Sequence, residues 1–439
     1  MRLLAGVLAL APVLLDAQAP SAPPPLAANQ PGTVLLGDLY AQAQVVNPRV
    51  AAARALAQAA QSRVPGAMRP PDPQLQFGFM NYSVPTLAPM STLGMRQLQV
   101  MQMLPLGGKL ALAGTVAGAQ ASAAGERAQE VTWELRSEMA MAFYDLYATD
   151  RRLEVMRATL RLLQDIEKTA ASMYRVGDGR QADVLRSQVE IARMVEDTVR
   201  MQAMRQTMVA RMNALLDRPT DTPVGVPVLP QFPDSIPPRA WLDSLARGNR
   251  PMIRAGLEDV RAAEASERLA RKEIWPDLQV GAQYAQRGGD MGGTERMGSL
   301  MVGASIPIFA RDRQYRMREE TAAMTQMAQA DVAMMRADTR GKLGEAYANL
   351  MRARNLAQLY RSTVLPQAEA TVASALAAYR VGGVDFMTLL DDQMTVNTYR
   401  QELFALDAEQ GKAWADLEML ASRALFDSNK ASAATRGDK

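Results

Sequence analysis

Two neighbouring aspartates, Asp391 and Asp392, are the residues of this sequence whose type and position best suit a functional charge. They stand near the expected start of a helix, where the helix dipole already favours a carboxylate and no further role is needed. Carboxylates held at a narrow point also attract cations, so a place on an ion path is the alternative interpretation. Four arginines are near enough in sequence to neutralise them: Arg175, Arg180, Arg186 and Arg380.

The usual catalytic side chains are missing. The chain of 439 residues contains no histidine and no cysteine, which removes the commonest general base, the commonest metal ligand, thiol chemistry and disulfides. Gly107-Gly108-Lys109 lacks the glycine spacing and the following Ser or Thr of a phosphate-binding loop, and fits a strand-to-helix joint better. We therefore expect no enzymatic activity and no cofactor.

Methionine is abundant, with 29 residues, and its thioether suits soft metal ions such as copper or silver. Methionine is also a good helix former that fills irregular gaps between helices. We favour the packing role and predict no metal ligand. The methionines at issue are Met101 and Met103 on an expected strand, and Met324, Met327, Met334 and Met335 on an expected helix.

A repeated tetrapeptide reveals how the chain is organised. Tyr174-Arg-Val-Gly177 recurs as Tyr379-Arg-Val-Gly382, at an offset of 205 (379 minus 174). Further landmarks recur in the same order at nearly the same spacing, so the chain is a tandem duplication of a unit of about 200 residues. These landmarks are Pro48 and Pro251 (offset 203), Pro73 and Pro276 (offset 203), and Pro105 and Pro307 (offset 202).

Long helices dominate the expected secondary structure. Ala, Arg, Met, Gln, Leu and Glu are frequent and aromatic residues make up only 5%, a composition that favours helix. Residues 106–218 contain no proline, so a helix from Leu110 to about Met173 would reach about 95 Å. Each Tyr-Arg-Val-Gly predicts the turn of a helical hairpin, in which the glycine supplies the left-handed cap. Pro366 predicts a kink in the second long helix.

Four shorter segments have the two-residue period of strands. The clearest is 278–284, where apolar residues alternate with Gln and Gly. Strands of about ten residues, apolar on one face and small or polar on the other, match those of outer-membrane barrels, although soluble hairpins packed on helices would show the same period. Four strands cannot close a barrel, which needs about eight, so two copies would give eight strands and three would give twelve.

The expected domain boundaries follow from the repeat. An apolar run after Arg2 predicts a signal peptide over 1–19, cleaved after Ala17 or Ala19, and the Pro- and Ala-rich segment 20–32 is expected to be disordered. The first repeat spans 33–216, with strands at 73–84 and 93–104 and a hairpin turn at 174–183. A proline-rich linker spans 217–240. The second repeat spans 241–425, with strands at 277–287 and 298–307 and a turn at 379–386, before a disordered tail at 426–439.

Five motifs recur together in one known family of proteins. They are Asn47-Pro48, Gln-Met-Leu-Pro-Leu-Gly-Gly-Lys at 102–109, the two Tyr-Arg-Val-Gly turns, Gln-Ala-Asp-Val-Leu-Arg-Ser-Gln at 181–188, and Asn-Ala-Leu-Leu-Asp-Arg-Pro at 213–219. With these motifs the chain resembles the TolC family of outer-membrane efflux proteins, over about residues 33–425. Details of the motifs are most similar to the heavy-metal-resistance branch of that family, the CzcC and CusC type.

The resemblance implies a mainly α fold with membrane β-structure. In the family three chains form a homotrimer, whose twelve-stranded β-barrel in the bacterial outer membrane takes four strands from each chain. A long α-helical barrel continues it across the periplasm. Its tips meet a periplasmic adaptor (membrane fusion protein) bound to an inner-membrane pump of the RND type. By position, the adaptor-contacting residues are Arg175, Val176, Gly177, Arg380, Val381 and Gly382.

The family also has a periplasmic constriction that carries aspartates just past the second turn. Asp391 falls on one matching position, while the other holds Thr388, and Asp392 is an additional carboxylate. Asp183, the counterpart of Thr388 in the first repeat, completes the expected gate. Whether the gate has one acidic ring or two stays open, and so does the resting state of the gate.

The function implied is a passive exit duct of a tripartite efflux system, with heavy-metal cations as one possible cargo. Two other interpretations stay open: an exit channel for drug efflux or type I protein secretion, and, in a different class, a periplasmic coiled-coil scaffold or adaptor. The net charge is only +3 and the acidic and basic residues alternate, so we expect no nucleic-acid partner.

Overall fold

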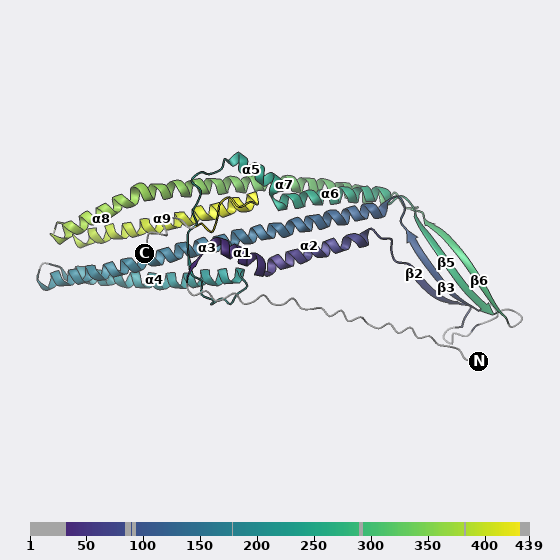
Figure 1. The fold of residues 1–439 in the computed structure, drawn as a ribbon, viewed down its shortest axis with the longest axis horizontal. Helices are drawn as coiled ribbons and strands as arrows, with labels where there is room; N and C mark the ends of the chain where they lie inside the picture. Colours follow the sequence, from purple (N-terminus) through teal and green to yellow (C-terminus); the bar gives the residue numbers. More distant parts are fainter. Residues whose placement is uncertain are drawn as a thin grey trace.

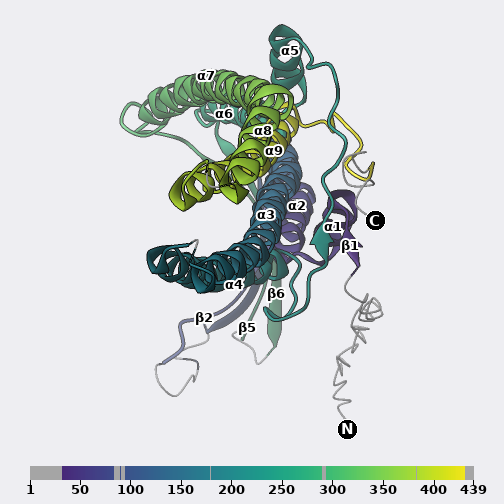
Figure 2. The same cartoon turned by 90° about the vertical axis from the view of Figure 1, so that its left-hand side faces the viewer.

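The computed structural model is a long, narrow molecule, with a β-sheet at one end and the turns of two helical hairpins at the other (Figure 1). It describes residues 32–83, 89, 94–177, 179–288, 293–381 and 383–430. The expected signal peptide lies outside the described residues, as do residues 20–31 and 431–439 of the two segments that were expected to be disordered. Seen along the long axis, the helices form a curved wall that is open on one side (Figure 2).

Each repeat contributes a short pair of helices, a two-stranded hairpin and a long helical hairpin. In the first repeat these are α1 (Leu36–Val46), α2 (Pro48–Ala67), β2 (Gln74–Met80), β3 (Met95–Leu104), α3 (Lys109–Arg175) and α4 (Gln181–Leu215). In the second they are α5 (Arg239–Asn249), α6 (Pro251–Lys272), β5 (Asp277–Gly288), β6 (Thr294–Ser305), α7 (Gln314–Leu359), α8 (Leu365–Arg380) and α9 (Phe386–Ala421). A parallel pair, β1 (Thr33–Val34) and β4 (Val226–Pro227), joins the linker to the start of the first repeat.

Prolines and asparagine set the helix starts. Pro48 and Pro251 stand at the first positions of α2 and α6, where a missing N–H is not needed. The Asn47 side chain accepts a bond from the N–H of Arg49 at 2.9 Å and donates to the carbonyl of Leu215 at 2.8 Å. This one residue therefore caps α2 and ties it to the end of α4.

The predicted kink at Pro366 takes the form of a π-helical segment, Tyr360–Val364, between α7 and α8. The N–H of Leu365 bonds to the carbonyl of Tyr360, five residues back. Because Pro366 has no N–H and its ring would press on the carbonyl four residues earlier, the wider turn accommodates it. Arg361 in this segment forms an ion pair with the buried carboxylate of Asp407 on α9.

The four long strands form one antiparallel sheet in the order β2-β3-β5-β6. β3 and β5 come from different repeats and pair from Met95 with Arg287 to Leu104 with Leu278. β2 ends at Met80, four residues short of the predicted 84, because Asn81 takes a left-handed conformation with φ 57°. β6 begins at Thr294, four residues before the predicted 298, because polar residues extend the hairpin, with Arg287 and Glu295 paired at 2.6 Å.

One face of this sheet is apolar and fully presented to the surroundings. Along the ladder Phe77 lies opposite Leu98, Leu98 opposite Tyr284, and Val280 opposite Val302, so these side chains share a face. Phe77 is 64% exposed and Val302 74%. The other face carries Gln and Gly together with Met101 and Met103, and Gln283 donates to Gln97 at 2.7 Å. This division is the one expected of a sheet with lipid on one side and a polar lumen on the other.

Three hydrophobic clusters hold the helices together. One surrounds Phe143 and Tyr144 of α3 in the middle of the molecule and packs against α1, α4 and the linker. Another surrounds Trp414 of α9 and packs against α5 and α7. The third lies at the end formed by the hairpin turns. Among the described helices none has a stretch long and apolar enough to cross a membrane.

Candidate functional site: the hairpin tips and the start of α9

The ends of the two long helical hairpins are packed into one unit. The third hydrophobic cluster joins Leu163 and Ile166 of α3 and Met194 of α4 to the end of α8 and the start of α9. At its edge the rings of Tyr379 and Phe386 meet edge to face, with centroids 6.1 Å apart. The four helix ends are therefore held by apolar packing, with the turns themselves projecting beyond it.

The first turn has the predicted cap. Gly177 takes φ 83°, a left-handed conformation that favours glycine. The N–H of Gly179 reaches back to the carbonyl of Met173 at 3.1 Å, which satisfies one of the free carbonyls at the end of α3. In the second turn the N–H of Gly383 bonds to the carbonyl of Ala378 at 2.8 Å. Gly382, one of the expected tip residues, lies outside the described residues.

The predicted tip residues are presented outward. Val176 is 71% exposed and Val381 82%, and Arg175 is exposed beside them. These two valines therefore offer apolar area at the end of the rod that a partner could cover. For Arg380 the structure places only the backbone, as the last residue of α8.

Thr388, an expected gate residue, takes part in a helix cap. The Asp385 carboxylate accepts bonds from the Thr388 N–H at 2.9 Å and from the Thr388 hydroxyl at 2.7 Å. These bonds lower the pKa of Asp385, and the positive charges of Arg180 and Arg186 lower it further. Sequence reasoning missed Asp385, although an Asp that follows a glycine turn and precedes a Thr by three residues is a helix-capping signal.

Asp391 and Asp392 occupy the second turn of α9. Asp391 is exposed, and the described residues of this chain offer its carboxylate no ion-pair partner. The charges of Arg180 and Arg186, two of the arginines named as possible partners of Asp391, act on Asp385. On α9 the exposed positions recur at helical spacing, so Asp391 belongs to a polar stripe on one face. The stripe consists of Thr388, Asp391, Thr395, Thr398 and Glu402.

Asp183 lies on the first turn of α4, half-buried, and close to Tyr379 of α8. Burial raises the pKa of the Tyr379 hydroxyl, and the negative charge of Asp183 raises it further. The structure thus brings Asp183 to the junction between the two hairpins, and brings Thr388 and Asp385 together on α9. Among the described residues no group of three or more acidic side chains could hold a metal ion.

The methionines divide between two environments. Met335 of α7 packs on Gly256 of α6, in the gap-filling role predicted for it. Met324, Met327 and Met334 are 49%, 59% and 62% exposed, so they do not fill the core of a single chain. The packing role predicted for these three stays a prediction, because the curved wall of one chain leaves their part of α7 uncovered.

A rod of helical hairpins, capped by an open sheet with an apolar outer face, defines a class of outer-membrane channel subunits. The family model described as outer membrane efflux protein matches residues 39–218 and 242–422, one match in each repeat. The chain belongs to this outer membrane efflux protein family, whose members lie in the outer membrane and extend into the periplasm.

Individual relatives agree with this assignment. The chain is 23% identical over 282 residues to the cobalt-zinc-cadmium resistance protein CzcC of Cupriavidus metallidurans, a match covering 63% of this chain and 64% of that protein. Its fold is similar to the outer membrane protein VceC of Vibrio cholerae, with a TM-score of 0.75, 17% identity, and 89% and 97% of the two chains covered. It is likewise similar to CusC, with a TM-score of 0.74, 17% identity, and 94% and 99% covered.

Proposed function

We propose that this protein is the passive exit duct of a tripartite efflux system, working as a homotrimer without catalysis of its own. The observation that supports this most is the sheet. Its outer strands β2 and β6 each have one edge without a strand partner among the described residues, while one whole face is apolar. Unpaired backbone groups cannot face lipid, so further copies must close the sheet, and three copies of four strands give twelve.

The short helices α2 and α6 support the same arrangement. They occupy equivalent places in the two repeats, and α6 packs between α3 and α7. α6 buries seven residues, whereas α2, which packs on α3, buries only Val50. Leu56 of α2 is 64% exposed at the place where α6 has Asp259. We infer that α7 of a second copy covers α2 as α7 of the same chain covers α6.

The hairpin tips are the proposed contact with a periplasmic adaptor, through which an inner-membrane pump of the RND type would supply the energy. Val176 and Val381 offer apolar area, and Arg175 adds charge. Arginine is enriched in protein–protein interfaces relative to the rest of a protein surface. Arg380 and Gly382 complete the proposed surface by their position in the second turn.

The start of α9 is the proposed periplasmic gate. In a trimer, three copies of the stripe that contains Thr388 and Asp391 would face one axis, with Asp392 and Asp183 at its margin. Three exposed carboxylates near one axis would attract cations and repel one another. Heavy-metal cations are the cargo that we favour, because the polar stripe carries Asp391 and because the chain is similar to CzcC.

One experiment tests the assembly and the conduction together. The full chain is expressed in a Gram-negative host, and the outer-membrane fraction is extracted in detergent, weighed by native mass spectrometry and reconstituted in planar bilayers. We expect a trimer that conducts ions. A chain that folds as a detergent-free soluble monomer would instead support the scaffold interpretation. Sensitivity of a duct-deficient host to cobalt, zinc and cadmium, compared with its sensitivity to drugs, then identifies the cargo.

A further inference from the structure

The joint between sheet and helices is held by a buried lysine that connects the two repeats. Lys109, at the start of α3, is 5% exposed. Its ammonium lies 2.8 Å from the carboxylate of Asp277 and 3.4 Å from that of Glu273, and donates to the carbonyl of Trp275 at 3.0 Å. All three partners belong to the second repeat. An ammonium this buried is tolerated because it is fully paired.

An aromatic ring on a glycine completes this joint. A β-carbon added at Gly107 would lie 3.5 Å from the ring of Trp275 and 3.7 Å from its β-carbon. The ring therefore lies within van der Waals reach of Gly107, whose φ of 73° favours glycine in the tight turn into α3. The joint of the first repeat, Pro105–Lys109, thus docks on residues 273–277, where the second repeat passes from helix to strand.

The equivalent joint of the second repeat is not docked on any of the described residues of the chain. By the offset of 202, Pro307–Arg311 corresponds to Pro105–Lys109, with Phe309 in the place of Gly107 and Arg311 in the place of Lys109. Ile308 is 82% exposed and Phe309 70%. Arg311 is exposed and has no ion-pair partner among the described residues.

The surface that would receive this joint is also uncovered. By the offset of 203, residues 70–74 correspond to 273–277, with Asp72 in the place of Trp275. This segment, Pro-Pro-Asp-Pro-Gln, leads from α2 into β2 and is exposed over Pro71–Gln74. The Asp72 carboxylate has no ion-pair partner among the described residues. Each copy thus has an uncovered joint that carries Arg311 and an uncovered segment that carries Asp72.

We propose that Phe309 and Arg311 of one copy dock on the segment around Asp72 of a second copy, in the manner of Gly107 and Lys109 on 273–277. This inference rests on the homotrimer of the proposed function and specifies residues at the interface between two copies. The large and small residues exchange sides: within the chain Trp275 packs on Gly107, and between chains Phe309 packs over Asp72 and its flanking prolines. The charges remain matched, one guanidinium to one carboxylate.

The joint of the second repeat is longer than that of the first, which fits the proposed docking. Phe309 and Ala310 lack the left-handed turn of Gly107 and Gly108, and α7 begins only at Gln314, whereas α3 begins at Lys109. Arg311 is therefore presented from a turn and not from a helix. A guanidinium offers five donors in a planar fork, which suits one carboxylate together with neighbouring carbonyls.

Cysteine pairs test the docking, because the chain has no cysteine of its own. The test variant is Asp72→Cys with Phe309→Cys. Within the chain the equivalent β-carbons would be 3.7 Å apart, inside the range that a disulfide needs. After oxidation and heat denaturation we expect covalently linked dimers and trimers, which reduction removes. Each single variant, and the control pair Arg63→Cys with Phe309→Cys, is expected to stay monomeric on the gel.

The outcomes separate this inference from the trimer itself. A trimer whose test pair does not crosslink overturns the docking and leaves the duct standing, whereas a wild-type chain that never trimerises overturns both. If the variant with both cysteines does not form a trimer, exchanging the charges at positions 311 and 72 provides the test. Arg311→Asp should lower the temperature at which the trimer dissociates, and Asp72→Arg in the same chain should restore it. No loss with Arg311→Asp, or no restoration, contradicts the pairing.

Discussion

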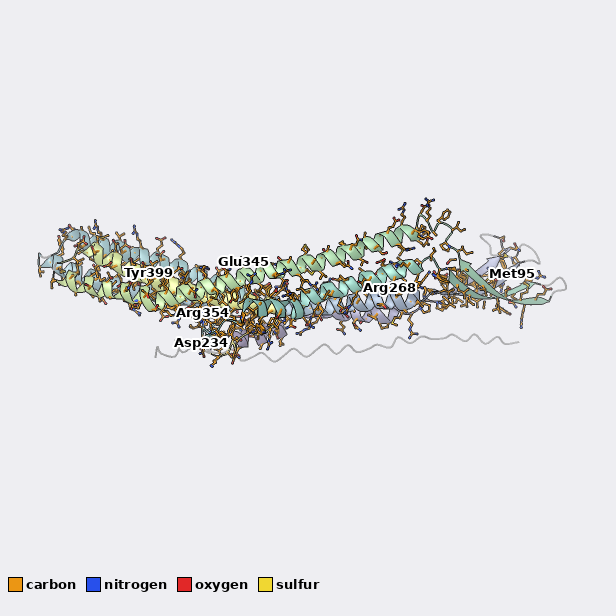
Figure 3. The ribbon with its side chains drawn as sticks, turned by 90° about the horizontal axis from the view of Figure 1, so that it is seen from above. Met95, Asp234, Arg268, Glu345, Arg354 and Tyr399 are labelled. Carbon is orange, nitrogen blue, oxygen red and sulfur yellow. The ribbon has the colours of Figure 1, made fainter. Side chains whose placement is uncertain are left out.

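Tyr174 and Tyr379 occupy the same place in the two repeats but differ sixfold in exposure, 47% against 8%. Tyr379 lies on the third hydrophobic cluster, beside the hairpin of the first repeat. Tyr174 is not part of that cluster, and the described residues leave nearly half of its surface exposed. A second copy would present the matching surface. The exposed Tyr174, the exposed face of α2 and the joint Pro307–Arg311 are thus three surfaces that a second copy would cover. Figure 3 shows the rod with its side chains.

We expect Tyr379→Ala to destabilise the tip within each chain, because it empties a packed site. Large aromatic-to-alanine changes in a core cost about 3–5 kcal/mol. Tyr174→Ala should leave the single chain nearly unchanged and weaken only the assembled trimer. Hydrogen exchange of residues 160–170, measured on trimer and on dissociated chains, distinguishes these effects. Equal loss of protection in both variants would contradict the expectation.

The Asp385 cap predicts a pH-dependent start of α9. The pKa of Asp385 is lowered in the folded chain, so its stabilising effect is present above the ordinary value of 3.8 and is lost as the pH falls through the lowered value. We expect the N–H of Thr388 to lose exchange protection in this acidic range. Asp385→Asn is the matched control, since Asn caps helices nearly as well but does not titrate. The same pH profile in the control would rule the explanation out.

Asp391→Ala should reduce cation selectivity and increase leak through the closed duct, because the proposed ring loses its charge. The measurement is single-channel conductance in planar bilayers, with and without divalent cations. Glu402→Ala, on the same exposed stripe but further along α9, is the matched control and should have a smaller effect. Unchanged conductance and cation sensitivity in Asp391→Ala would remove this residue from the gate.

The strand register between copies follows from the repeat. Within the chain Gln102 lies opposite Val280. The repeat equivalent of Gln102 is Ala304 (102 plus 202), and that of Val280 is Phe77 (280 minus 203). Ala304 of one copy should therefore lie opposite Phe77 of the next. We expect Ala304→Cys with Phe77→Cys to crosslink efficiently between chains, and Ala304→Cys with Phe79→Cys less so. Preferential crosslinking of the second pair would indicate a register shifted by two residues, which keeps the same face outward.

A buried ion pair between the repeats gives a prediction of stability. Arg250 and Glu130 are 7% and 1% exposed and lie 3.0 Å apart, and Arg250 also donates to Thr339 at 2.6 Å. Glu130→Ala leaves a buried guanidinium without its partner, which costs about 3–5 kcal/mol. The control Glu190→Ala breaks a surface pair with Arg193 and should cost less than about 1 kcal/mol. Denaturant unfolding monitored by circular dichroism compares the two variants, and similar midpoints would contradict the prediction.

The sequence by itself determined the duplication, the four strands and the helical hairpins, because these depend on local signals. Proline and glycine punctuation, the two-residue period of 278–284 and the recurrence of Tyr-Arg-Val-Gly are read within a few residues of one another. Strand ends were less accurate, since Asn81 and the Arg287–Glu295 pair decide them through conformation and contact.

Only the tertiary structure decided which charges meet. Lys109 reaches Asp277 across 168 positions of the sequence, and the charge of Arg180 acts on Asp385, because packing between the two repeats sets these neighbours. The same holds for what is left uncovered. Leu56 and Phe309 are apolar residues whose counterparts in the other repeat are Asp259 and Gly107, and only the folded chain shows that its described residues leave both exposed. Burial depends on contacts between distant segments, which local patterns do not encode.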